Sequence, residues 1–239
     1  MPKDHTVSAY DKELENLRSS IARMGGLAEA QIAGAVDALF KRSSDRSAQV
    51  VAADKSLDSL ELSIEKDAIS LLARRQPMAS DLREIVSALK MSSILERIGD
   101  YSKNIAKRVG AISDAQNFRV VRTVGDMAHL VQKMLKDVLD AYIDQDEVKA
   151  LDVWERDTAV DELYNSLFRE LLTYMMEDPR SITPCTHLLF AAKNVERMGD
   201  HVTNLAEIVY YLVKGDLLED TRPKSDSTSY TVLRPSDDD

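Results

Sequence analysis

The chain has 239 residues, 41 of them acidic and 31 basic, which gives a net charge of −10. This balance argues against a nucleic-acid-binding protein, which needs a basic surface. The single cysteine, Cys185, excludes a disulfide framework and a cysteine-based zinc site. With only 8 glycines and 6 prolines, a glycine-rich α/β enzyme and a turn-rich β-sandwich are also excluded. Because no run of about 18 apolar residues and no signal-peptide core occurs, we expect a cytoplasmic protein without membrane insertion.

The first half of the chain contains three long stretches with apolar residues at helical spacing. The first covers about 8–42, and the cluster 43–45 then provides a stop and a new helix cap. The second runs to about Gln76, where Pro77 ends it, and the third covers about 80–109. A helix of about 30 residues is about 45 Å long. Three such rods bury their apolar stripes by packing side by side as a bundle.

The same pattern returns in the second half, where we expect helices over about 118–143, 146–176 and 183–214. The halves also match residue by residue, first at a spacing of 103 and later at a spacing of 100. The matched acidic pairs are Asp54 with Asp157, Asp58 with Asp161, Glu96 with Glu196, and Asp100 with Asp200. The spacing changes at the turn between the second and third helices, where a change of length is tolerated.

These patterns predict an all-α protein of two tandem three-helix bundles that are related by an internal pseudo-twofold axis. The expected parts are an N-terminal arm (1–7), a first bundle (8–113), a second bundle (114–216) and a tail (217–239). The tail consists largely of Thr, Arg, Pro, Ser and Asp, so we expect it to be disordered and acidic.

The third and sixth predicted helices share a heptad-like apolar seam. It consists of Met91, Leu95, Ile98, Ser102, Ile105 and Val109 in the third helix, and of Ala191, Val195, Met198, Val202, Leu205 and Val209 in the sixth. We expect these side chains to form the core of each bundle, with methionine as packing material.

A polar strip with a spacing of four residues runs along the same two helices. Its members are Glu96, Asp100 and Asn104 in one helix and Glu196, Asp200 and Asn204 in the other. The strip lies roughly opposite the apolar seam, so we expect it to face outward. Neighbouring carboxylates repel by about 0.2–0.5 kcal/mol, and a glycine such as Gly99 or Gly199 costs about 1 kcal/mol against alanine. A cation that bridges the carboxylates is one candidate for what offsets both penalties.

The second and fifth helices add a matching set of carboxylates, Asp54 and Asp58 in one and Asp157 and Asp161 in the other. If neighbouring helices lie about 8–10 Å apart, these groups approach the strip. Oxygen ligands suit hard cations such as Mg²⁺, Mn²⁺, iron or Ca²⁺. The other interpretation is that the carboxylates are simply solvated on a helix surface and, at most, pair with Arg97 or Arg197.

Three alternative functions remain open at this point. A carboxylate di-iron enzyme needs Glu-x-x-His on two helices, and the chain contains no such tetrapeptide. A phosphotransfer domain could use His201, although its repeat counterpart is Tyr101. A passive helical scaffold without metal or signalling role requires none of these groups.

The segments Glu96-Arg97-Ile98-Gly99-Asp100 and Glu196-Arg197-Met198-Gly199-Asp200 resemble the signature of the PhoU family of bacterial phosphate transport regulators. The resemblance covers about 8–214, and Asp81-Leu82-Arg83 also fits the family pattern. The second half departs from it, because Ser181-Ile182-Thr183 stands at the corresponding place. Two copies of the signature in matching helices of an acidic all-α chain are far more specific than one.

The resemblance implies regulation rather than catalysis. It implies a cytoplasmic adaptor, often a homodimer, that restrains the phosphate-starvation response and phosphate uptake. Such an adaptor links the ATPase subunit of the phosphate ABC transporter to a sensor histidine kinase. The resemblance also implies metal binding at Glu96, Asp100, Glu196 and Asp200, and with them at Asp54, Asp58, Asp157 and Asp161, the metal being Fe, Mn, Mg or Zn.

Overall fold

The structure is a computed structural model that describes residues 3–112, 118–218 and 228. Its regular elements are α1 (Lys3–Lys41), α2 (Ser44–Arg75), α3 (Ala79–Ile112), α4 (Phe118–Asp144), α5 (Glu147–Glu155), α6 (Asp157–Glu177), the short 3₁₀ helix η1 (Pro179–Ser181) and α7 (Ile182–Lys214). The predicted all-α fold is therefore confirmed for the described residues.

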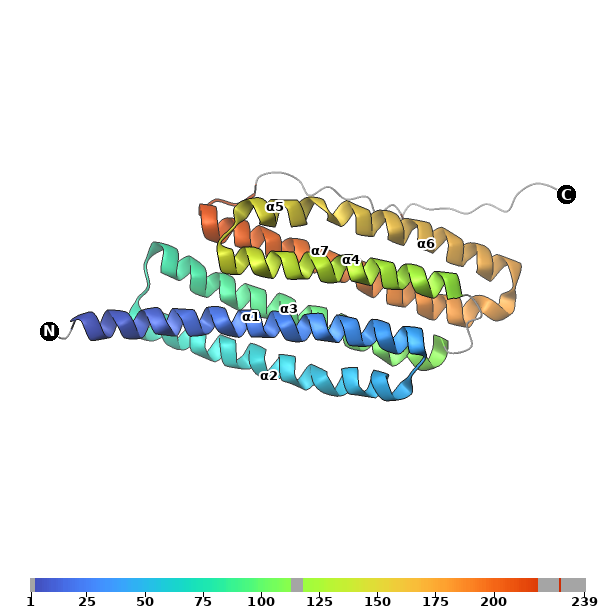
Figure 1. Ribbon diagram of the computed structural model, residues 1–239, viewed down its shortest axis with the longest axis horizontal. Coiled ribbons are helices and arrows are strands. Elements are labelled where there is room, and N and C mark those ends of the chain that lie inside the picture. Colours follow the sequence, from blue (N-terminus) through green and yellow to red (C-terminus); the bar gives the residue numbers. More distant parts are fainter. Residues whose placement is uncertain (1–2, 113–117, 219–227, 229–239) are drawn as a thin grey trace.

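The helices form two layers of roughly parallel rods, with α1, α2 and α3 in one layer and α4 to α7 in the other (Figure 1). The helices α3 and α7 lie at the centre of the molecule. Helix α3 packs against α1, α2 and α7, and helix α7 packs against α3, α4, α5 and α6. Each central helix therefore has neighbours on several sides, and little of its surface is left for solvent.

Contacts between repeat-equivalent residues mark the pseudo-twofold axis. Tyr101 of α3 stacks on its counterpart His201 of α7, with ring centroids 5.5 Å apart and planes 21° apart. The Tyr101 hydroxyl lies 3.4 Å from His201 Nε2. A residue touches its own counterpart only close to the axis that relates the two copies, so the axis passes between α3 and α7 at this point.

The apolar seam of α3 and α7 is confirmed as core. All twelve predicted seam residues are buried, among them Met91 and Met198, which have no exposed surface. Burying a side chain of this size contributes about 1.5–3 kcal/mol. The two seams and the facing residues of the other helices merge into one continuous core, so packing joins the two bundles.

Two helix boundaries differ from the prediction. α1 begins at Lys3, within the residues expected to form an arm. The fifth predicted helix is broken at Arg156 into α5 and α6. The Arg156 guanidinium there binds Asp137 of α4 at 2.7 Å and Asp152 at 3.0 Å. This tie to a neighbouring helix is a tertiary contact, which the local sequence pattern does not contain.

Other predicted features fall mainly on residues outside the described part. These are the first two residues of the arm, the junction between the bundles (113–117) and most of the tail. No helix in the described part combines the length and the hydropathy needed to cross a membrane.

Candidate functional site: two acidic clusters

The first candidate site lies between α2 and α3. We call Asp54, Asp58, Glu61, Glu96 and Asp100 the first acidic cluster. Asp54 is 5% exposed, Glu96 and Asp100 are half-buried, and Asp58 lies in solvent. The structure thus brings four predicted site residues to one helix pair, at different depths.

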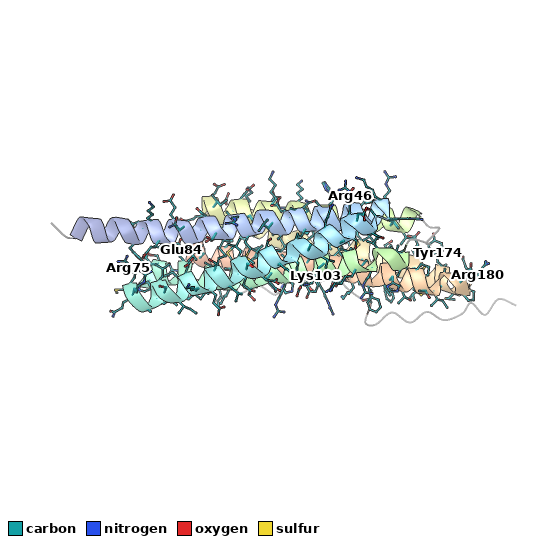
Figure 2. The ribbon with its side chains drawn as sticks, turned by 90° about the horizontal axis from the view of Figure 1, so that it is seen from below. Arg46, Arg75, Glu84, Lys103, Tyr174 and Arg180 are labelled. Atoms are coloured by element: carbon teal, nitrogen blue, oxygen red, sulfur yellow. The ribbon has the colours of Figure 1, made fainter. Side chains whose placement is uncertain are left out.

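A lysine that the sequence analysis did not identify occupies this cluster. Lys103 Nζ donates hydrogen bonds to Asp54 of α2 and to Asp100 of α3, the latter over 2.5 Å. Burial alone would lower the pKa of Lys103, but the hydrogen bonds to Asp100 and Asp54 raise it above its ordinary value. The ammonium group is therefore charged at neutral pH, and it ties the C-terminal half of α3 to the N-terminal half of α2 (Figure 2).

Glu96 is the perturbed acid of the first cluster. Burial, and after it the charges of Asp100, Glu61, Asp58 and Asp54, raise its pKa to about 7. Burial also raises the pKa of Glu61, against a hydrogen bond from Ser93. A carboxyl group with a pKa near 7 exchanges a proton in the physiological range, so the charge of this cluster varies with pH.

The second acidic cluster consists of Asp157, Asp161, Glu196 and Asp200, on α6 and α7. The first three are 1%, 2% and 5% exposed, which makes this cluster the more deeply buried of the two. Lys193 Nζ lies 2.9 Å from Glu196 Oε1, one helical turn away on α7. The Lys193 ammonium also sits over the ring of Tyr164, 4.9 Å from its centroid.

The glycine that occurs in both repeats explains how close these helices come. A Cβ atom at Gly199 would lie 2.9 Å from Asp157 Oδ1, and one at Gly99 would lie 2.4 Å from Leu57 Cδ1. The glycines therefore admit a side chain of the neighbouring helix against the helix backbone. Packing of this kind offsets the helix-propensity cost of about 1 kcal/mol, and no cation is needed to explain it.

The prediction that both polar strips face outward is wrong at Glu196, which is 5% exposed, whereas the other five strip residues are half-buried. Asp54 of α2 and Asp157 and Asp161 of α6, the carboxylates expected to approach the strips, are buried as well. The prediction treated each third helix as packed on one side only. Since α3 and α7 are surrounded by other helices, the face opposite the seam is covered as well.

The lysines of the two clusters occupy positions that are not equivalent in the repeat. At the spacing of 100, Lys103 corresponds to Thr203, and Lys193 corresponds to Ser93. Thr203 has no exposed surface, and its hydroxyl donates to the Asp200 backbone oxygen at 2.7 Å. The signal that could have found Lys103 is its place one turn after Asp100, as a basic residue where the other copy has none.

The oxygen-only side chains of both clusters suit a hard cation in chemical type. Within the described ranges, no group of three or more His, Cys, Asp or Glu residues is arranged to hold a metal ion. In the first cluster, the space between Asp54 and Asp100 is taken by the Lys103 ammonium. The metal-binding role of the eight residues stays a prediction.

Comparison with known proteins identifies the family. The PhoU domain matches the chain twice, over residues 21–109 and 124–209. The chain belongs to the PhoU family. Each PhoU domain match contains one acidic strip, so the internal repeat found in the sequence is the repeat of this domain.

Curated PhoU relatives are similar along nearly the whole chain. A phosphate-specific transport system accessory protein PhoU homolog of Caulobacter vibrioides (strain NA1000 / CB15N) is 51% identical, over 95% of this chain and 99% of its own. The homolog of Rhizobium meliloti (strain 1021) is 49% identical, over 96% of this chain and 97% of its own. Both relatives therefore include both bundles.

Solved PhoU structures have the same fold. The crystal structure of PhoU from Pseudomonas aeruginosa matches with a TM-score of 0.83 and 41% identity, over 87% of this chain and all of that one. The phosphate transport system regulatory protein PhoU from Streptococcus pneumoniae matches with a TM-score of 0.82 and 30% identity, over 88% and 99%. The predicted PhoU-like arrangement of tandem bundles is thus confirmed.

Proposed function

We propose that this PhoU-family chain is a cytoplasmic, non-enzymatic regulator of phosphate homeostasis, which restrains phosphate-starvation signalling and phosphate uptake. It does so by contacting the ATPase subunit of the phosphate ABC transporter and a sensor histidine kinase, and it acts as a homodimer. The observation that carries this proposal is the similarity, over nearly the full length, to accessory proteins of the phosphate-specific transport system.

The surface of the molecule supports a role in protein contacts. The turn from α2 to α3, the turn from α4 to α5 and the C-terminal end of α7 lie at the same end of the molecule (Figure 1), and large apolar side chains are exposed on these segments. They are Met78, Leu82, Ile143, Val148 and Leu217, each 42–79% exposed. Lys214 of α7 lies 2.7 Å from Glu147 of α5, which holds two of these segments together. Exposed apolar groups that gather in this way favour a protein partner.

An adaptor acts by binding one state of its partner more tightly than another. The structure offers a rigid body for this purpose, because one core runs through both layers. We propose that the end of the molecule with the exposed apolar residues Met78, Leu82, Ile143, Val148 and Leu217 contacts the transporter ATPase. Whether the ATPase is bound there then signals the state of the transporter to the kinase.

The function is tested in a deletion strain grown in high phosphate with a reporter for a phosphate-scavenging gene. We expect derepression of the reporter in the deletion strain and restored repression when the chain is supplied. Normal repression in the deletion strain contradicts the proposal.

The contact surface is tested with Leu82→Glu, against Leu62→Glu as the matched control. Leu62 is 64% exposed on α2 and belongs to another part of the surface. We expect only Leu82→Glu to lose co-purification with the ATPase subunit and to leave the reporter derepressed. Equal behaviour of the two variants rejects the assignment of the surface, and light scattering of the purified chain tests the homodimer.

A further inference from the structure

The first acidic cluster contains its own cation. Lys103 reaches from α3 across to Asp54 of α2 and also binds Asp100 on its own helix. Its side chain is 21% exposed, and that of Asp54 is 7% exposed. The ammonium group thus lies between a buried carboxylate, Asp54, and a carboxylate that is 44% exposed, Asp100, where a metal ion bound to both would otherwise have to sit.

We propose that Lys103 is a built-in counter-ion that closes the first acidic cluster to divalent cations. The inference concerns the chemistry of the cluster and holds independently of the proposed function.

The geometry decides between lysine and metal. A divalent cation needs carboxylate oxygens at about 2.0–2.6 Å. Asp54 and Asp100 already accept hydrogen bonds from the same ammonium group, that of Lys103. A metal can take both only after Lys103 leaves. Lys103 would then lose two charge-assisted hydrogen bonds, and the charges of Lys103 and the metal would repel each other.

Comparison between the repeats shows that this closure belongs to one unit. The position of Lys103 is taken by Thr203 in the second unit, and that side chain is fully buried and neutral. The lysine of the second unit, Lys193, lies one turn before Glu196 and pairs with it on α7, and its ammonium also lies over the Tyr164 ring of α6. Lys103 thus binds carboxylates on two helices, whereas Lys193 binds a carboxylate of its own helix and an aromatic ring of the neighbouring one.

The test is Mn²⁺ binding by equilibrium dialysis with detection of free Mn²⁺ by electron paramagnetic resonance. Lys103→Met is compared with wild type and with Lys107→Met, which removes the same charge from an exposed place one turn further along α3. We expect Lys103→Met to bind about one further Mn²⁺ per chain, or to bind it at least about ten-fold more tightly. We expect Lys107→Met to behave as wild type.

The origin of the gained site is tested with the double variant Lys103→Met/Asp100→Asn, in which we expect the gain to disappear. Equal Mn²⁺ binding by Lys103→Met and Lys107→Met overturns the proposal, and so does a gain that survives the Asp100→Asn change. Circular dichroism confirms that each variant is folded before its binding is compared.

A second measurement uses the wild-type chain and decides the question even if Lys103→Met does not fold. Amine-reactive labelling followed by peptide mass analysis compares Lys103 with Lys107, with and without Mn²⁺. We expect slow labelling of Lys103, unchanged by Mn²⁺, because its ammonium stays bound to Asp54 and Asp100. Faster labelling of Lys103 when Mn²⁺ is added shows that the metal displaces the lysine, which overturns the proposal.

Discussion

The two acidic clusters have the same ancestry in sequence but are neutralised in different ways. In the first, Lys103 binds carboxylates of both α2 and α3, whereas in the second, Lys193 pairs with Glu196 of its own helix and lies over the Tyr164 ring of α6. Four carboxylates and the glycine are present in both copies, but the lysines stand at positions that are not equivalent in the repeat. Duplication has thus preserved the backbone and the acids, while the partners of the acids changed separately in each unit.

The largest effect is expected in the part that the units share. Ile98 and Met198 occupy equivalent seam positions and have no exposed surface. Because alanine leaves a cavity at either place, Ile98→Ala and Met198→Ala should each lower the free energy of unfolding by about 2–5 kcal/mol, measured by urea denaturation. Leu62→Ala on the surface should cost less than about 0.5 kcal/mol. If one seam variant is as mild as this control, the seams are not equivalent.

The next effect concerns the ion pair that joins two helices. Asp54→Asn keeps the shape of the side chain but removes the charge that Lys103 binds across the helix pair. We expect the free energy of unfolding to fall by about 1–3 kcal/mol. The matched control is Asp58→Asn, one turn along α2 and exposed to solvent, which should change stability by less than about 0.5 kcal/mol. Equal effects of the two changes contradict the bridging role of Lys103.

A smaller effect with opposite signs is expected for the two equivalent glutamates. The folded chain raises the pKa of Glu96 from 4.5 to about 7 and so favours its protonated form. Glu96 therefore contributes its full stabilisation below pH 4.5, and this contribution is lost as the pH rises through the window from 4.5 to about 7. Because glutamine stays neutral, Glu96→Gln should remove the repulsion between the ionised Glu96 and its neighbouring carboxylates. We expect the free energy of unfolding of the variant to be about 0.5 kcal/mol higher than that of wild type above this window.

Glu196→Gln should instead destabilise the chain above the same window, because Glu196 is buried and paired with Lys193. Thermal unfolding of wild type and both variants across this pH range gives the comparison. If both substitutions change stability in the same direction at high pH, the described difference between the clusters is wrong.

The smallest effect is expected at the pseudo-twofold axis. The stacked rings of Tyr101 and His201 are partly exposed and joined by a long polar contact of 3.4 Å. A double-mutant cycle with Tyr101→Ala and His201→Ala should give a coupling energy of about 0.5 kcal/mol. A coupling energy of zero shows that the contact does not contribute to holding the two units together.

The sequence was sufficient for the features that depend on periodicity. The helical spacing of Met91, Leu95 and Ile98 predicts a buried seam, and the repeated acids predict two equivalent units, because both signals lie along one helix. The sequence did not predict the break at Arg156 or the burial of Asp157. Both depend on which helix packs alongside, and no local pattern contains that information.

The same limit explains why Lys103 was missed. Its repeat counterpart is a threonine, so a search for duplicated residues passes over it. Its importance arises from the position of Asp54, which lies 49 residues earlier in the chain. Only the packing of α2 against α3 brings the two together.

The contact between Tyr101 and its own counterpart His201 shows that the molecule is built like a dimer whose subunits have been fused. In a dimer of identical chains, every substitution appears on both sides of the axis at once. Covalent linkage removes that constraint, and it also keeps the halves together at any dilution. A lysine could therefore arise beside one acidic cluster without arising beside the other. The two halves of one polypeptide thus carry equivalent carboxylates with different charged partners.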